Sequence, residues 1–150
     1  MTLRNVALWL HIIGASMWLG TNVAQMLIGP RLVNEGAGLQ WLKAVDKASG
    51  PIYGTASVLI LLTGIYMVLS SDGAYSFGSA FVGIGIAVVI IGGALAGLVF
   101  NRKTRQAIGL FESGDSARAL PVYKSIGSWA VLDTALLAFA VLAMVSKWGV

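Results

Sequence analysis

Four apolar segments of about 20 residues each constrain this chain more than any other feature of its sequence. They cover residues 6–29, 51–70, 79–100 and 127–147. A helix needs about 20 residues to cross a hydrocarbon core of about 30 Å, and a helix satisfies its own backbone hydrogen bonds within lipid. We therefore predict an all-α fold: a single-domain integral membrane protein built as a bundle of four transmembrane helices.

The composition supports contact with a lipid bilayer. Apolar residues make up 57% of the 150 residues and charged residues 11%, which is too little charge to cover a water-facing surface of this size. There are no cysteines, so disulfides, thiolate metal sites, iron–sulfur clusters and covalently attached haem are excluded. The net charge of +4 does not predict a nucleic-acid partner, because the basic residues flank the apolar segments.

Prolines and turn residues divide the predicted helices. We expect Gly29-Pro30 to end the first span and Gly50-Pro51 to open the second, with Pro51 in the first helical turn. Residues 70–73, Ser-Ser-Asp-Gly, predict a tight turn that makes the second and third spans antiparallel neighbours.

The two longer loops are predicted to hold short amphipathic helices. Residues 38–48 place Leu39, Leu42 and Val45 near one face, which predicts an interfacial helix anchored by Trp41. Residues 102–124 predict an extension of the third helix, a break, and a second short helix that stops near Pro121.

The positive charges predict an orientation. Eight Lys and Arg residues lie in the first and third loops, and only Arg4 and Lys147 lie on the other side. The positive-inside rule then places these loops in the cytoplasm and both termini outside. We expect the inner membrane of a bacterium, and we predict no removable signal peptide, because the first apolar run is too long for one.

His11, the only histidine, is the first candidate site residue. It lies about 7 Å inside the first span, on a helix face that is small and polar and should point into the protein. The other members of that face are Gly14, Ala15, Trp18, Asn22 and Gln25. His11 is either a neutral histidine bonded to a neighbouring helix or a ligand to haem iron or copper. Met67 and Met144 lie at a suitable depth to supply a second, thioether ligand, and Trp18 either packs in the core or forms a wall beside a planar ligand.

Asp133 is the only carboxylate within a predicted span. It lies at a depth similar to that of Asn22, Gln25, Thr55 and Ser57, whose amides and hydroxyls are expected to bond to it. Two interpretations stay open: a structural contact between the first and fourth helices, and a proton or cation relay.

Glycines concentrate in the third span, where Gly93 and Gly97 form a small-xxx-small pair. This pair indicates close packing inside the bundle, a seam between copies of the chain or with other subunits, or a flat surface for a tetrapyrrole. Hydrolase motifs and phosphate-binding loops are absent from the sequence, and no catalytic residue is predicted.

Part of the chain resembles small membrane proteins of the HemJ and CopD type. The shared residues are Leu10-His11, Trp18, Gly20, Pro30-Arg31-Leu32, Gly50-Pro51, Thr63-Gly64 and the closing Val145-Ser146-Lys147. In HemJ-like proteins the histidine of the first helix is associated with b-type haem and protoporphyrinogen oxidation, and CopD-like proteins are associated with copper uptake. Only His11 carries over. The sequence lacks the histidine expected just after Pro30-Arg31 and the lysine and histidine of the third HemJ-like helix, so the resemblance implies a related fold with one retained ligand.

Three functions are therefore predicted. The first is binding of b-type haem or copper through His11, in electron transfer or in haem or copper handling. The second is a non-catalytic accessory subunit without a cofactor, which joins a larger membrane complex or a homo-oligomer through the Gly93/Gly97 face. The third is a small proton- or ion-coupled transporter that uses Asp133.

Overall fold

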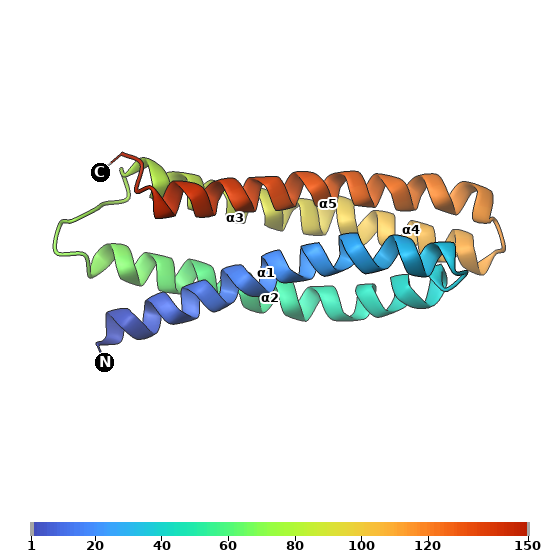
Figure 1. The fold of residues 1–150 in the computed structure, drawn as a ribbon, viewed down its shortest axis with the longest axis horizontal. Coiled ribbons are helices and arrows are strands. Elements are labelled where there is room, and N and C mark those ends of the chain that lie inside the picture. The colour runs from blue at the N-terminus through green and yellow to red at the C-terminus, as the bar shows by residue number, and fades with distance from the viewer. Residues whose placement is uncertain (1, 150) are drawn as a thin grey trace.

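The computed structural model describes residues 2–149, and these form a bundle of long helices (Figure 1). The helices in chain order are α1 (Leu3–Asn34), α2 (Gly38–Leu69), α3 (Ala80–Leu95), η1 (Ala96–Phe100), α4 (Asn101–Glu112) and α5 (Ser116–Val145). The segments α3, η1 and α4 follow one another without a break, so they act as one helix. The predicted four-helix bundle is thus confirmed, and the described residues contain no strand.

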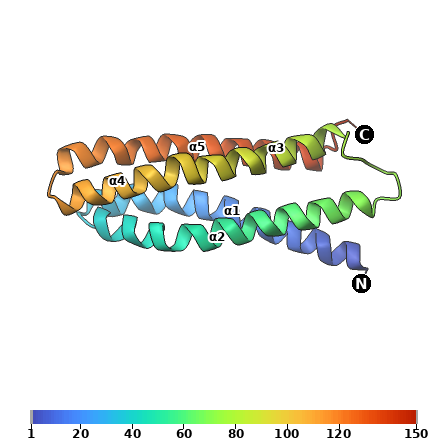
Figure 2. The ribbon, with the colours of Figure 1, turned by 180° about the vertical axis from the view of Figure 1, so that it is seen from behind.

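The two ends of the bundle differ in their connections. Both chain termini and the loop of residues 70–79 lie at one end, which we call the terminal end (Figures 1 and 2). The short turns 35–37 and 113–115 lie at the other end, the turn end. The long loop joins α2 to α3, and these two helices stand apart at the terminal end in both views.

All four helices are apolar enough and long enough to cross a bilayer. They span 32, 32, 33 and 30 residues with mean hydropathies between 1.3 and 2.5. At 1.5 Å per residue each is about 45–50 Å long, so its ends extend beyond a hydrocarbon core of about 30 Å. Large apolar side chains are exposed around the bundle, including Ile12, Leu27, Leu62, Ile90, Leu132 and Phe139. Lipid contact explains an exposed apolar surface of this extent.

The predicted helix boundaries at two prolines were wrong. Pro30 lies inside α1 and Pro51 inside α2, so neither one ends or opens a helix. A proline usually excludes helical backbone at the preceding residue, because its ring meets that residue's Cβ. Both prolines follow glycine, Gly29 and Gly50, which removes the Cβ part of this contact, but Pro121 follows Leu120 and also lies inside a helix.

The amphipathic segments of the two loops are helical, but they are continuous with the spanning helices. Residues 38–48 form the first turns of α2, with Leu42 buried. The predicted extension of the third helix is confirmed as α4, which is joined to α3 through the π-helical η1. The last short helix does not stop near Pro121, because that proline lies inside α5.

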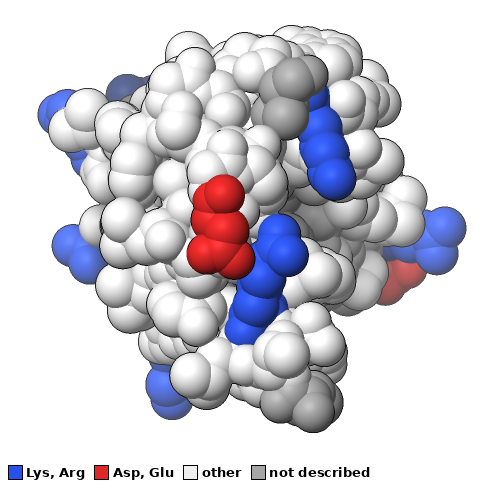
Figure 3. All heavy atoms as spheres, turned by 90° about the vertical axis from the view of Figure 1, so that its left-hand side faces the viewer, with Lys and Arg blue, Asp and Glu red and all other residues white. Residues whose placement is uncertain are grey.

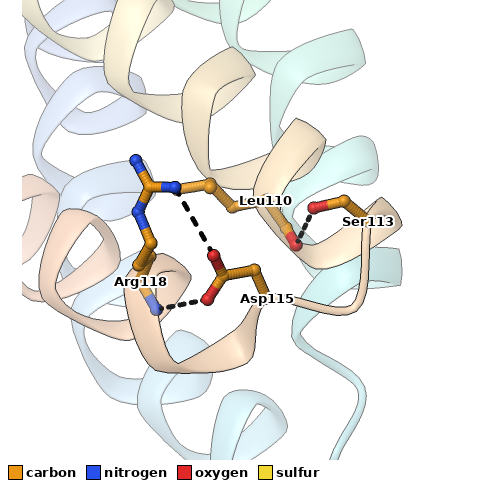
Figure 4. Close-up of polar contacts among 4 residues, drawn as sticks. All are labelled: Leu110, Ser113, Asp115 and Arg118. Carbon is orange, nitrogen blue, oxygen red and sulfur yellow. Dashed lines mark hydrogen bonds and ion pairs between the residues drawn. The ribbon is translucent and has the colours of Figure 1, made fainter.

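The predicted break between the last two helices is confirmed at residues 113–115 (Figure 4). Asp115 caps α5, since its Oδ1 accepts a hydrogen bond of 3.1 Å from the backbone N–H of Arg118. Ser113 Oγ donates to the Leu110 carbonyl at the end of α4 over 3.0 Å. Gly114 between them has φ +79°, a left-handed conformation that favours glycine.

Small residues bring the helices close together in the core. Ala56 and Ala143 are fully buried, and Gly14 of α1 faces α2 so closely that a Cβ there would lie 3.0 Å from Ile60 Cγ1 and 3.1 Å from the Ala56 carbonyl oxygen. Within lipid, helices associate through packing of this kind, because lipid tails are as apolar as the side chains themselves.

Substitution of Gly14 tests this packing. We expect Gly14→Leu to destabilise the bundle by about 1–3 kcal/mol, because the side chain would meet the α2 backbone, which cannot move aside cheaply. The measurement is the midpoint of thermal unfolding in detergent. Gly20→Leu is the matched control on the same helix, because a Cβ at Gly20 meets no atom within 4 Å. Equal midpoints for the two variants would contradict the packing described here.

Candidate functional site

A cavity opens inside the bundle at the terminal end. It has a volume of about 620 Å³ and is bounded by α1, α2, the 70–79 loop, α3 and the end of α5. Its walls are mainly apolar, with Leu8, Ile60, Phe81 and Val89 among the lining residues. Sites for organic ligands in proteins have volumes of roughly 300–1,000 Å³ and similarly apolar walls, so this cavity has the size of a cofactor site.

His11 lines this cavity and is held by α2. Its Nδ1 lies 3.0 Å from Thr63 Oγ1, and the Thr63 hydroxyl donates to the Leu59 carbonyl. The Thr63 oxygen is therefore left to accept, so Nδ1 carries the ring proton and donates it to Thr63. In this tautomer the lone pair is on Nε2, which is the nitrogen that a neutral histidine offers to a metal.

The two methionines predicted beside His11 also line the cavity. Met67 comes from α2, one helical turn beyond Thr63, and Met144 comes from α5. Met144 fills the space over Gly85 of α3, where its Cε occupies the position that a side chain would take. The structure thus brings His11, Met67 and Met144, which lie far apart in the sequence, to the wall of one cavity.

Asp133 belongs to a second polar group, the buried cluster, which consists of Trp18, Asn22, Gln25, Tyr53 and Asp133. Asp133 Oδ2 accepts hydrogen bonds from Trp18 Nε1 at 2.9 Å and Asn22 Nδ2 at 2.8 Å. Tyr53 Oη donates to Asn22 Oδ1 at 2.5 Å, and Gln25 Nε2 donates to Tyr53 Oη at 3.2 Å. Trp18, Asn22 and Asp133 are 2%, 4% and 4% exposed, so water cannot replace these bonds.

The buried cluster joins all four helices. Its α1 side chains meet Tyr53 of α2 and Asp133 of α5, and the Trp18 ring lies directly over Gly92 of α3. A Cβ at Gly92 would clash with the Trp18 ring and would lie 3.2 Å from Asp133 Oδ1. The predicted structural contact between the first and fourth helices is therefore present, and it extends further than expected.

Of the two alternatives for Trp18, packing in the core is the one that the structure shows. Trp18 donates to Asp133 and packs edge-on against Tyr53, with ring centroids 5.9 Å apart, and it is not among the residues that line the cavity. The predicted partners Thr55 and Ser57 do not bond to Asp133, since Ser57 Oγ donates to the Tyr53 carbonyl of its own helix and Thr55 is exposed. Tyr53, which the sequence prediction did not include, is the α2 member of the cluster.

Gly93 and Gly97 face outward. Both are exposed, and a Cβ at either position meets no atom within 4 Å. The expectation that this pair packs inside the bundle was therefore wrong; Gly92, one residue earlier, fills that role. The outward face leaves the helix backbone open to close approach by another transmembrane helix.

The described residues contain no group of three or more His, Cys, Asp and Glu side chains that could hold a metal ion. Asp133 bonds to Trp18, which follows His11 by about 10 Å along α1. Comparisons of the chain with protein-family models, curated proteins and solved structures yield no match.

Removal of the Asp133 carboxylate tests the buried cluster. We expect Asp133→Leu to lower the free energy of unfolding by about 1–3 kcal/mol, because Trp18 Nε1 and Asn22 Nδ2 lose their shared acceptor. Asp133→Asn should cost less, since its carbonyl oxygen still accepts from both donors. Thermal unfolding in detergent measures both effects. Thr134→Val is the control, because the Thr134 hydroxyl bonds only to the Ala130 carbonyl and, at 3.7 Å, to Met26 sulfur. Stability of Asp133→Leu equal to that of Thr134→Val would contradict a structural role.

Proposed function

We propose that this protein binds b-type haem in the cavity at the terminal end, with His11 as an axial ligand, and that it serves in electron transfer or haem handling. The observation that carries this proposal is the state of His11: it lines a cavity of about 620 Å³, and the bond from Nδ1 to Thr63 leaves its Nε2 lone pair for a ligand. Metal-bound histidines usually donate the N–H of their other ring nitrogen to a neighbouring acceptor.

The residues around the cavity fit a haem. The volume suits an organic cofactor, the walls are mainly apolar, and Met67 and Met144 line the same space as His11. Imidazole and thioether together form a known pair of haem ligands. Haem iron would supply one-electron chemistry, while the protein would supply the imidazole, the apolar surroundings and the exclusion of water.

Copper is the less favoured ligand for this cavity. Imidazole and thioether ligands also suit Cu(I), but a copper ion needs only two or three converging donors. A cavity of several hundred Å³ with an apolar wall is better explained by an organic molecule. We further propose the orientation that the positive-inside rule predicts, with the turn end in the cytoplasm of a bacterial cell and the terminal end outside.

Loss of His11 tests the proposed function. We expect the purified protein to bind one haem with a shifted Soret band, and His11→Ala to weaken that binding about tenfold or more, because the axial imidazole is lost. Absorption titration with haem measures both, and parallel assays for bound copper separate the two ligands. Ile12→Ala, which changes another residue of the same cavity wall, is the control and should bind as the unaltered protein does. A Soret band that is the same with and without His11 would rule out axial ligation.

The outward glycine face supports a second proposal, that the chain associates with another transmembrane helix. Gly93 and Gly97 lie one turn apart on the exposed side of the third helix, with no atom of the described chain in front of them. Such a face is suited to a homo-oligomer or to the role of an accessory subunit in a larger membrane complex, and both are compatible with a haem site at the terminal end.

Enlarging these two glycines tests the association. We expect the double variant Gly93→Leu/Gly97→Leu to shift the chain from oligomers to single copies in lipid nanodiscs, because the side chains would hold a partner backbone away. Counting of photobleaching steps on labelled protein measures the number of copies. Gly54→Leu is the control, since Gly54 on α2 is also exposed and faces no atom within 4 Å. An unchanged copy number in the double variant would exclude this face as a self-association surface.

A further inference from the structure

The Lys and Arg side chains are distributed unevenly between the two ends of the bundle. Of the ten Lys and Arg residues in the chain, eight belong to the turn end. The remaining two are Arg4, at the start of α1, and Lys147, just after α5, and both line the cavity. Figure 3 looks onto this end, where cationic side chains lie on two sides of a hollow and an acidic side chain lies beside one of them.

Arg4 and Lys147 have no carboxylate partner among the described residues. The ion pairs within residues 2–149 are Lys43–Glu112, Arg105–Asp46 and Arg118–Asp115. Asp72 lies close enough to Arg4 to influence its guanidinium, but the two form no ion pair. Two cations therefore border one apolar cavity, and neither forms an ion pair within residues 2–149.

The guanidinium of Arg4 is held in place by the 70–79 loop. Its Nη2 donates to Tyr75 Oη at 2.9 Å, and its Cζ lies 5.9 Å from the centroid of the Tyr75 ring. Tyr75 in turn packs edge-on against Phe81 of α3, with centroids 5.5 Å apart. Tyr75 and Phe81 also line the cavity. A guanidinium has five N–H donors, so four remain for a bound group after the bond to Tyr75.

We propose that the cavity binds an amphipathic acid, whose carboxylate groups contact Arg4 and Lys147 and whose apolar body lies among the side chains of the cavity. Carboxylates form strong charge-assisted hydrogen bonds with guanidinium groups. Water and lipid headgroups at the membrane surface would surround the charged end of the ligand, and the apolar wall would surround the rest. This inference rests on the proposed function in that it concerns the same cavity, and haem, which carries two carboxylates, belongs to this class.

The test uses metal-free protoporphyrin IX and its dimethyl ester, which have the same ring and differ in the two carboxylates. Binding is followed by porphyrin fluorescence with the full chain in nanodiscs of phosphatidylcholine, and empty nanodiscs give the background. We expect the unaltered protein to bind the diacid at least about tenfold more tightly than the ester, a preference that corresponds to about 1.4 kcal/mol.

The double variant Arg4→Gln/Lys147→Gln should lose this preference and bind both porphyrins with similar affinity. Arg102→Gln/Lys103→Gln is the matched control, because it removes one arginine and one lysine at the turn end and should keep the preference. Circular dichroism confirms that both variants fold. Equal affinity of the unaltered protein for diacid and ester would overturn the inference, as would the same loss of preference in both double variants.

A further arm separates the explanations. The preference for the diacid should remain when phosphatidylglycerol is added to the nanodiscs. If the preference disappears, the two cations bind a lipid phosphate, and a carboxylic ligand is rejected. The two proposals can fail separately. If the haem spectrum does not depend on His11, only the proposed function is wrong. If the spectrum depends on His11 but the diacid and the ester bind equally, only this inference is wrong.

Discussion

The hydrogen bonds to Asp133 are the interaction on which the arrangement of the four helices depends. Helices in lipid gain little from burying apolar surface against one another, so directional contacts and close packing must fix their relative positions. Here one carboxylate oxygen receives two donors from α1, while Tyr53 of α2 closes the chain of bonds through Asn22. Gly92 of α3 gives the Trp18 ring the space it needs to reach Asp133. No other group of side chains in the described residues joins all four helices by such contacts.

The position of the buried cluster explains why the bundle is open at one end. Between Trp18 and the turn end, short turns hold α1 against α2 and α4 against α5. Between Trp18 and the terminal end, the ten-residue loop 70–79 lets α2 and α3 separate (Figure 1). Residues of both helices line the cavity at this end. Unfilled volume lowers the stability of a packed bundle. The buried cluster holds the four helices together next to this volume, so the bundle stays assembled although the cavity lowers its stability.

Much of this architecture follows from the sequence, and the errors have physical causes. Segment length and hydropathy predict four helices in any chain that must satisfy its backbone within lipid, and the polar stripe of α1 predicts which face turns inward. The helix boundaries failed at Pro30, Pro51 and Pro121, because the restriction that proline places on the preceding residue is a preference, and all three prolines lie inside long helices. The choice between Gly92 and Gly93 as the packing glycine depended on helix rotation, which sequence spacing alone does not fix to one residue.

The cavity itself was not predictable, because it arises from the separation of α2 and α3 and from residues on five segments of the chain. The sequence grouped His11, Met67 and Met144 as one candidate site because of their depth, and all three line the cavity, but the cavity itself became evident only in three dimensions. The bond from His11 to Thr63 adds a constraint of its own. Because the Thr63 hydroxyl is already committed to the backbone of α2, its oxygen can serve His11 only as an acceptor. The helix backbone thus determines which imidazole nitrogen keeps its proton, and the ligand-binding character of His11 depends on the hydrogen-bonding pattern of a neighbouring helix.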